Sequence, residues 1–330
     1  MNNNSATPVA KASAQAMWQA VADPDLSGSL RKTQDRVQEL LNTPGTVVVT
    51  SGVEESLTLL CGTEDPMYTA IGDPLYALTR PHADSPANAA KYGFLSAVNE
   101  EYGLVYDISA QAKGLKRANP DIVVVLDITQ AVGRLDLRDL PKEIDAVVLD
   151  SRTCYCGPGA GALWVRDENT LLGRMSGGFQ QRGFRPGMVS PILAAGFAAG
   201  LQMILEQQAA WFDYISRMRA KLDHVLEHAG NFSINYRTQP LVCNTSNFHI
   251  PGIWTKPVVL GLRRLGITVS DSVAGLENTA ACTPLTAQLF EDEARHSNLR
   301  ISLSALNTEA EVMDAAKKII KAVFVANSLK

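Results

Sequence analysis

Short apolar runs alternate with helix-like stretches through the first two thirds of the chain. Apolar residues recur at helical spacing over Leu30–Leu41 and Ile192–Trp211. Four other runs are brief, apolar or β-branched, and bounded by Gly, Pro, Asp or Ser, which is typical of buried strands. These runs are Thr46–Thr50, Ile122–Leu126, Ala146–Leu149 and Ala162–Val165. The alternation predicts an α/β domain in which helices cover both faces of a mostly parallel sheet.

The pattern changes after about residue 215. Met218–His228 is amphipathic, and a final helix, Glu309–Ala326, follows Thr308, a good N-cap residue. Three segments between them alternate like half-exposed strands: Phe232–Tyr236, Thr245–Ile250 and Leu299–Leu303. This region therefore predicts a smaller α+β domain.

Composition narrows the class of protein. The 330 residues are 46% hydrophobic and 19% charged, which suffices for a substantial core. The net charge of −4 argues against nucleic acid as the main partner. Because no run approaches the ~18 apolar residues of a membrane span, we expect a cytoplasmic protein without membrane association. Five cysteines and no signal peptide argue against a disulfide scaffold, so any special cysteine is expected to be reactive or metal-binding.

The first candidate site is the turn Val48–Ser56, between a predicted strand and a helix start. Free backbone N–H groups and the helix dipole favour an anion there, although the turn is equally consistent with an ordinary connection. Glu54 and Glu55 lie in this turn, and their charges argue against a bound phosphate.

Two further candidates follow the next predicted strands. Asp127 and Gln130 come at the carboxyl edge of the sheet, where ligands of open α/β sheets bind, although Asp127 is also suited to capping the turn. The glycine-rich segment Asp150–Ala162 contains Cys154 and Cys156, which point the same way if the segment is extended. Arg152 is positioned in sequence to lower a thiol pKa and raise reactivity.

The remaining cysteines divide into two kinds. Cys282 lies in the small-residue loop Asn278–Pro284, where a thiol is accessible. Cys61 and Cys243 lie beside apolar runs and are interpreted as packing residues.

The order of these segments resembles the cysteine desulfurases, a class V aminotransferase branch of the fold type I pyridoxal-phosphate (PLP) enzymes. Eight ordered matches over nearly the whole chain carry the resemblance. They are Asn3–Pro8, Thr50–Gly52, Asp127–Gly133 (DITQAVG), Ser151–Ala162, Gly177–Gly187 (GGFQQRGFRPG), Asn244–Gly252, Ala281–Thr283 and Ser297–Ser302.

The resemblance implies a large α/β domain with a mostly parallel seven-stranded sheet over residues 15–214. It also implies a small α+β domain, made of residues 1–14 and 215–330, and a homodimer. Cys282 falls at the position of the persulfide-forming cysteine, and Arg300 at that of the arginine that receives the substrate carboxylate. Asp127, Gln130 and Ser151 match residues of the cofactor pocket.

Several departures fall on the same cofactor. Cys154 stands at the Schiff-base lysine position, and the nearest lysine, Lys142, precedes the strand. Without that amine, PLP is not held as an internal aldimine. Four further departures are Thr153 for a histidine, Glu54 and Met188 for phosphate-binding threonines, and Asp73-Pro74 at the ring-stacking histidine. We therefore predict that the protein does not use PLP.

Three functional hypotheses remain, and the first is favoured narrowly. In the first, Cys282 meets Cys154 and Cys156 in the vacated pocket, where three thiolates carry a persulfide or bind an iron–sulfur cluster or zinc; His249 or His296 is an alternative fourth ligand. In the second, the chain is a pseudoenzyme that binds a true desulfurase, a sulfur acceptor or an iron–sulfur scaffold. In the third, PLP binds noncovalently, with Asp127 at its ring nitrogen and Arg300 holding an amino acid.

Overall fold

The computed structural model describes residues 1–22, 26–62, 65–69, 85–171, 175–271, 286, 290 and 294–328. The chain forms two compact units. The large unit comprises Ala6–Ala97 and Tyr106–Gln208, and the small unit comprises Met1–Ser5, Val98–Val105 and Ala209–Lys330. None of the helices within the described residues is both long enough and apolar enough to cross a membrane.

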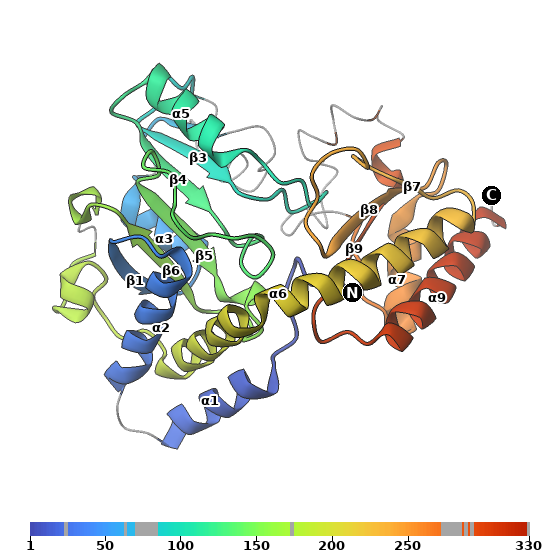
Figure 1. Cartoon of the computed structure of the whole chain (residues 1–330), viewed down its shortest axis with the longest axis horizontal. Coiled ribbons are helices and arrows are strands. Elements are labelled where there is room, and N and C mark those ends of the chain that lie inside the picture. The colour runs from blue at the N-terminus through green and yellow to red at the C-terminus, as the bar shows by residue number, and fades with distance from the viewer. Residues whose placement is uncertain are drawn as a thin grey trace. The chain divides into compact units, whose positions relative to one another are not determined.

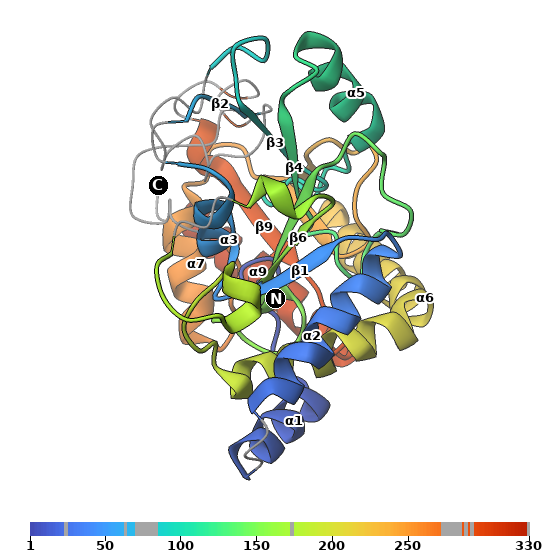
Figure 2. The ribbon, with the colours of Figure 1, turned by 90° about the vertical axis from the view of Figure 1, so that its left-hand side faces the viewer.

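The large unit is built on a mixed sheet with the strand order β1-β6-β5-β4-β3-β2 (Figures 1 and 2). β6 is antiparallel to both β1 and β5, and the other pairs are parallel. The strands are β1 (Thr46–Thr50), β2 (Met67–Thr69), β3 (Tyr92–Ser96), β4 (Val123–Asp127), β5 (Ala146–Asp150) and β6 (Gly161–Val165). The four predicted strands are β1, β4, β5 and β6. The described residues form six of the seven strands that the resemblance implies.

Helices and short 3-10 turns surround this sheet. They are α1 (Lys11–Ala22), α2 (Leu26–Leu41), α3 (Val53–Leu60), α5 (Ile108–Ala118), η1 (Ser151–Thr153), η2 (Glu168–Thr170), η3 (Gln180–Gly183) and the first part of α6 (Pro191–His228). α3 packs its buried leucines, such as Leu57 and Leu60, against Val48, Val148 and Leu163 of the sheet. This apolar contact fixes the start of α3 beside the end of β1.

α6 joins two segments that the sequence pattern predicts separately. No Gly or Pro occurs from 201 through 228, so no helix-breaking residue ends the helix where the hydrophobic pattern changes, after about residue 215. Gly200 matters for a different reason. A Cβ atom there would lie 1.9 Å from the Cys154 carbonyl oxygen, so only glycine lets α6 pass this closely to the turn after β5.

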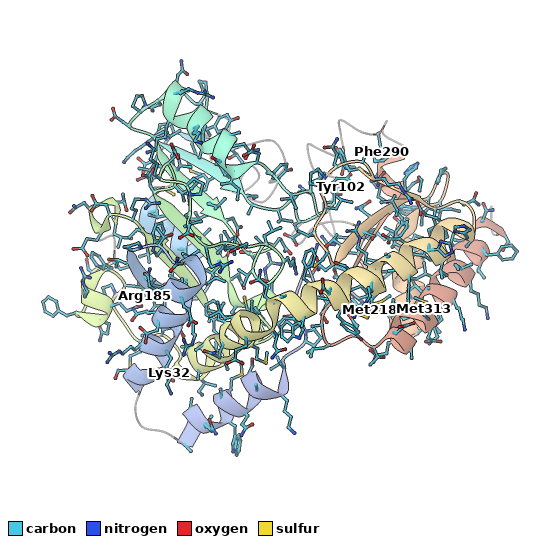
Figure 3. The ribbon with its side chains drawn as sticks, in the orientation of Figure 1. Lys32, Tyr102, Arg185, Met218, Phe290 and Met313 are labelled. Carbon is cyan, nitrogen blue, oxygen red and sulfur yellow. The ribbon has the colours of Figure 1, made fainter. Side chains whose placement is uncertain are left out.

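The small unit contains the antiparallel sheet β7-β8-β9. Its elements are β7 (Ser233–Ile234), β8 (Thr245–His249), α7 (Thr255–Arg264), η4 (Ala294–Ser297), β9 (Asn298–Ser302), α9 (Glu309–Ser328) and the end of α6. Its core contains Phe248, Ile301 and Ile319 together with Met218 of α6, and the partly buried Met313 of α9 packs against it; both methionines are labelled in Figure 3.

The division differs in detail from the expected 1–14 plus 215–330. Residues 1–5 lie beside β9, where Asn3 N–H donates to the Ser302 carbonyl. Residues 6–14 belong to the large unit because Thr7 N–H donates to the Arg152 carbonyl at 2.8 Å and Ala10 N–H to the Tyr155 carbonyl at 2.9 Å. The other boundary falls within α6, between 208 and 209.

Candidate functional site

Three turns of the large unit meet at one edge of the sheet. Because β6 is antiparallel to both neighbours, β1 runs in the same direction as β4 and β5. Thr50 and Asp150, the last residues of β1 and β5, both pair with Gly161. The turns after β1, β4 and β5 therefore lie at the carboxyl edge, where ligands bind in open α/β sheets.

The turn between β1 and α3 is occupied by a carboxylate of its own helix. Gly52 is the N-cap of α3, so Glu55 is the third helical residue. Its Oε2 accepts the N–H of Ser51, the residue before the N-cap, at 2.6 Å. Its Oε1 accepts Arg185 Nε–H at 3.0 Å. A backbone donor and a guanidinium that suit an anion are thus both satisfied by Glu55.

The loop that carries Arg185 also contacts β1. The Gln181 side chain accepts the Val49 N–H at 2.7 Å and donates to the Val49 carbonyl at 2.7 Å. This pairing covers backbone groups at the outer edge of β1, which is an end strand of the sheet. Figure 3 labels Arg185 within the large unit.

Three further carboxylates influence one another at this edge. Burial raises the pKa of the Asp150 carboxyl, and the charges of Glu54 and Asp127 raise it further, against the opposing effects of the Arg152 N–H and guanidinium. Asp127 accepts the Thr129 N–H at 2.7 Å and so caps the turn after β4. The edge is therefore acidic.

Gln130 and Ser151, which also match the cofactor pocket, make hydrogen bonds within their own turns, and Thr153 joins two of the turns. Gln130 Oε1 accepts Arg134 Nη1–H at 2.5 Å, and both side chains are buried. Ser151 Oγ–H donates to the Gly157 carbonyl at 2.7 Å and accepts the Ala160 N–H at 3.2 Å, which closes the glycine-rich segment. Thr153 Oγ1–H donates to the Thr129 carbonyl at 2.7 Å and ties the turns after β4 and β5 together.

Two expectations about Cys154 and Cys156 are wrong. The segment is not extended, because it begins with the 3-10 turn η1 and continues through Tyr155 at φ +59°. The thiols are not activated, because burial raises the pKa of Cys154 well above its ordinary value and that of Cys156 to about 12. Arg152 does not overcome this effect; it interacts with Asp150.

Both thiols donate to nearby carbonyls, Cys154 to Asp150 at 3.7 Å and Cys156 to Ser151 at 3.2 Å. They are free cysteines with exposed fractions of 0% and 2%. Cys61 and Cys243 are also free and buried, as the packing interpretation predicted.

Arg300 lies in the small unit, on β9, and is 1% exposed. Its Nη2 donates to Asn2 Oδ1 at 2.9 Å and to Ser5 Oγ at 3.1 Å, and its Nη1 to the Glu100 carbonyl at 3.3 Å. Glu100 Oε1 lies 3.9 Å from Nη1. A substrate carboxylate reaches this guanidinium only if the surrounding groups give way.

Several predicted site residues lie outside the described residues, namely Cys282 with its loop and Asp73-Pro74. The meeting of Cys282 with Cys154 and Cys156 therefore stays a prediction. Across the described ranges, no three His, Cys, Asp or Glu side chains gather in a way that suits a metal ion. Of the alternative ligands, His296 is exposed, and His249 stacks on Phe290 at 4.6 Å, with its pKa lowered by burial.

The sequence pattern located several residues of the site but did not predict which side chains they contact. Arg185 lies in a quoted motif and Glu55 in a quoted turn, but 130 residues separate them. Arg134, which holds Gln130, follows directly after the motif DITQAVG. A match between Arg185 and the excess acid in the turn is the one signal that was available.

Solved structures identify the class of fold. The chain superposes on a NifS-like protein with a TM-score of 0.84 and 20% identity over 98% of both chains. It superposes on a cysteine desulfurase from Thermococcus onnurineus with a TM-score of 0.79 and 15% identity, covering 98% of this chain and 94% of that one. The fold is that of the fold type I PLP enzymes.

The family follows from the sequence. The model of the class-V aminotransferases matches residues 82–314, and the chain belongs to this family. Cysteine desulfurase IscS of Proteus mirabilis is 28% identical over 232 residues, which cover 68% of this chain and 56% of that protein. The IscS of Photobacterium profundum is 26% identical over 345 residues, covering 93% and 82%. The chain thus spans little more than half the length of the first curated relatives it matches.

The residues at the described edge do not fit the cofactor that this fold implies. A phosphate at the Ser51 N–H would meet the Glu55 carboxylate, which already holds that donor and Arg185. Like charges a few Å apart repel, so the carboxylate disfavours a phosphate at this position. No lysine occurs from 143 through 220 to form a Schiff base at the turn after β5.

Proposed function

We propose that this chain is a cysteine-desulfurase-like protein that does not use PLP and acts by binding, as a noncatalytic partner of a true desulfurase or a sulfur acceptor. The observation that carries the proposal is the Glu55 carboxylate, which satisfies both Ser51 N–H and Arg185. An intramolecular anion competes with any phosphate at an effective concentration that a free ligand does not reach. The same contact argues against noncovalent PLP.

We favour binding over sulfur transfer because of the two thiols in the turn after β5. A persulfide forms on a thiolate, and burial raises the pKa of both Cys154 and Cys156, which disfavours the thiolate at both positions. Burial also withholds them from a sulfur acceptor. The turn therefore supports a structural role for both residues.

The proposal includes self-association through the large unit, with a second copy of the chain as the occupant. Phe179 is 94% exposed and Met188 is 64% exposed, on the loop that Gln181 and Arg185 fasten to β1 and Glu55. A fastened apolar side chain loses little conformational freedom on binding. Dimerisation also suits the homodimer that the family resemblance implies.

Titration of the full chain with PLP tests the central proposal. We expect neither a new visible absorbance band nor release of sulfide from cysteine. Glu54→Thr/Glu55→Ala is expected to bind inorganic phosphate at least tenfold more tightly than the original chain, because two repelling carboxylates are gone. Glu39→Ala, which removes an exposed glutamate from α2, is the control and leaves phosphate affinity unchanged.

A visible PLP band together with sulfide release by the original chain overturns the proposal. Sedimentation of the same preparations tests self-association: the original chain should be dimeric, and Phe179→Asp should shift it toward monomer. If the original chain is monomeric, the proposed self-association is wrong, whereas the proposal about PLP is unaffected.

A further inference from the structure

A cavity lies in the small unit, along the end of α6. The cavity is about 370 Å³, and its walls are two neighbouring stripes of α6 and the segment from Ile234 to Leu241. One stripe carries Arg219, Asp223 and Glu227, and the other carries His224 and His228. The proposed binding function uses none of these side chains.

The charges of the first stripe are already balanced. Asp223 lies 3.4 Å from Arg219 Nε and accepts Ser246 Oγ–H at 2.6 Å, while Glu227 pairs with Arg237. A simple anion or a hard cation therefore gains little from this wall. The histidines supply the distinctive chemistry of the cavity.

His224 and His228 are exposed and are spaced i, i+4, so they project from one face of the helix. Their ring centroids lie 4.0 Å apart. Two imidazoles this close are within reach of one ion bound about 2.0–2.1 Å from each nitrogen. The helix fixes the spacing in advance, so little freedom is lost when an ion binds.

The hydrogen bond of His228 favours the same use. Its Nδ1 lies 2.8 Å from the His224 carbonyl oxygen, which only accepts, so Nδ1 carries the proton. The Nε2 lone pair is then available to a metal. Metal-bound histidines characteristically donate their other ring N–H to a carbonyl or carboxylate in this way.

We propose that His224 and His228 form a two-nitrogen site for Zn²⁺ or another late first-row divalent ion, with water completing the coordination. No larger cluster of metal-binding side chains occurs in the described part of the chain, so the ion keeps open positions. Imidazole suits Zn²⁺, Ni²⁺ and Cu²⁺, and Cu²⁺ is expected to bind most tightly of the three. The site is independent of the proposed binding function.

Calorimetric titration of the metal-free, untagged full chain with ZnCl₂ tests the site. His224→Gln and His228→Gln should each weaken this binding at least tenfold, and the double variant should abolish it. His296→Gln, which removes an exposed histidine of η4 in the same unit, is the matched control and should bind as the original chain does.

Zinc bound elsewhere on the chain contributes equally to the titrations of all these proteins, so only a difference between a variant and the original chain reports on this site. All three positions are exposed, so far-UV circular dichroism and the unfolding midpoint of each metal-free protein should be unchanged. If the double variant binds as many zinc ions as tightly as the original chain, the site does not exist. Equal losses in His296→Gln would also overturn it.

Discussion

Two arginines that match family motifs have very different surroundings. Arg185 of the large unit donates from Nε to the Glu55 carboxylate at 3.0 Å, and its side chain is 15% exposed. Arg300 of the small unit is 1% exposed and donates to a carboxamide, a hydroxyl and a backbone carbonyl. The carboxylate of Glu100 lies 3.9 Å away from it, beyond hydrogen-bonding distance.

The difference separates two ways of keeping an arginine. Arg185 is neutralised by the chain itself, so its anion-binding capacity is used up within the fold. Arg300 donates to neutral acceptors around its fork and has the Glu100 carboxylate at 3.9 Å. The neutral acceptors orient the guanidinium and make it part of the packing between residues 1–5 and β9. A motif match alone does not tell these cases apart, because both arginines fit equally well.

Replacement of Arg300 should have the largest effect. Arg300→Ala removes a buried side chain and leaves the part-buried Asn2 Oδ1, Ser5 Oγ and Glu100 carbonyl without this donor, so we expect the free energy of unfolding to fall by about 3 kcal/mol. Urea unfolding of both proteins measures the loss.

Arg300→Lys is the control, because it keeps the charge but not the planar fork, and should lose an intermediate amount. Arg185→Ala should lose less, since its pair is partly solvated. A loss in Arg300→Ala no greater than in Arg185→Ala would remove the contrast between the two sites.

The second prediction concerns the pairing of Glu55 with Arg185 beside the turn after β1. A double-mutant cycle with Glu55→Gln and Arg185→Gln should give a coupling energy of about 1–2 kcal/mol in urea unfolding, because the two groups are hydrogen-bonded and mostly buried. Glu54→Gln combined with Arg185→Gln is the matched control and should couple by less than about 0.5 kcal/mol. Equal coupling in the two cycles would mean that general acidity, not Glu55, neutralises Arg185.

Much of the fold could be predicted from local pattern. β1, β4, β5 and β6 each form where a short β-branched or apolar run is bounded by turn residues, since such runs bury both faces. The division within α6 was not predictable to the residue. The sequence pattern changes after about residue 215, whereas the boundary between the units falls between 208 and 209, and no Gly or Pro from 201 through 228 ends the helix there.

The site was less predictable because its contacts are distant in sequence. The turn after β1 and the acidity of Glu54 and Glu55 were visible, but the pairing of Glu55 with Arg185 joins positions 130 apart. The expectation that Cys154 and Cys156 point the same way was wrong for a local reason. Period-2 reasoning holds only in extended backbone, and Tyr155 adopts a positive φ.

The smallest predicted effect concerns the turn after β5. Glu55 prevents anion binding in the turn after β1, and this prediction tests whether burial likewise prevents ionisation of the Cys156 thiol. Burial raises the pKa of Cys156 to about 12 in the folded chain, against about 8.5 for an exposed thiol. The folded state therefore holds this proton more tightly than the unfolded state. The stabilisation is complete below the unfolded pKa, and is lost as pH rises from there through about 12.

Cys156→Ser isolates this effect, because the serine hydroxyl keeps a donor toward the Ser151 carbonyl but does not ionise in this range. Between pH 7.5 and 9.5 the original chain should lose about 1 kcal/mol more unfolding stability than Cys156→Ser. Urea unfolding at the two pH values measures the difference, and other ionisations are shared by both proteins. Equal losses of stability in the two proteins would mean that the Cys156 thiol ionises as readily in the folded chain as in the unfolded chain. The turn after β5 would then tolerate a negative charge, unlike the turn after β1.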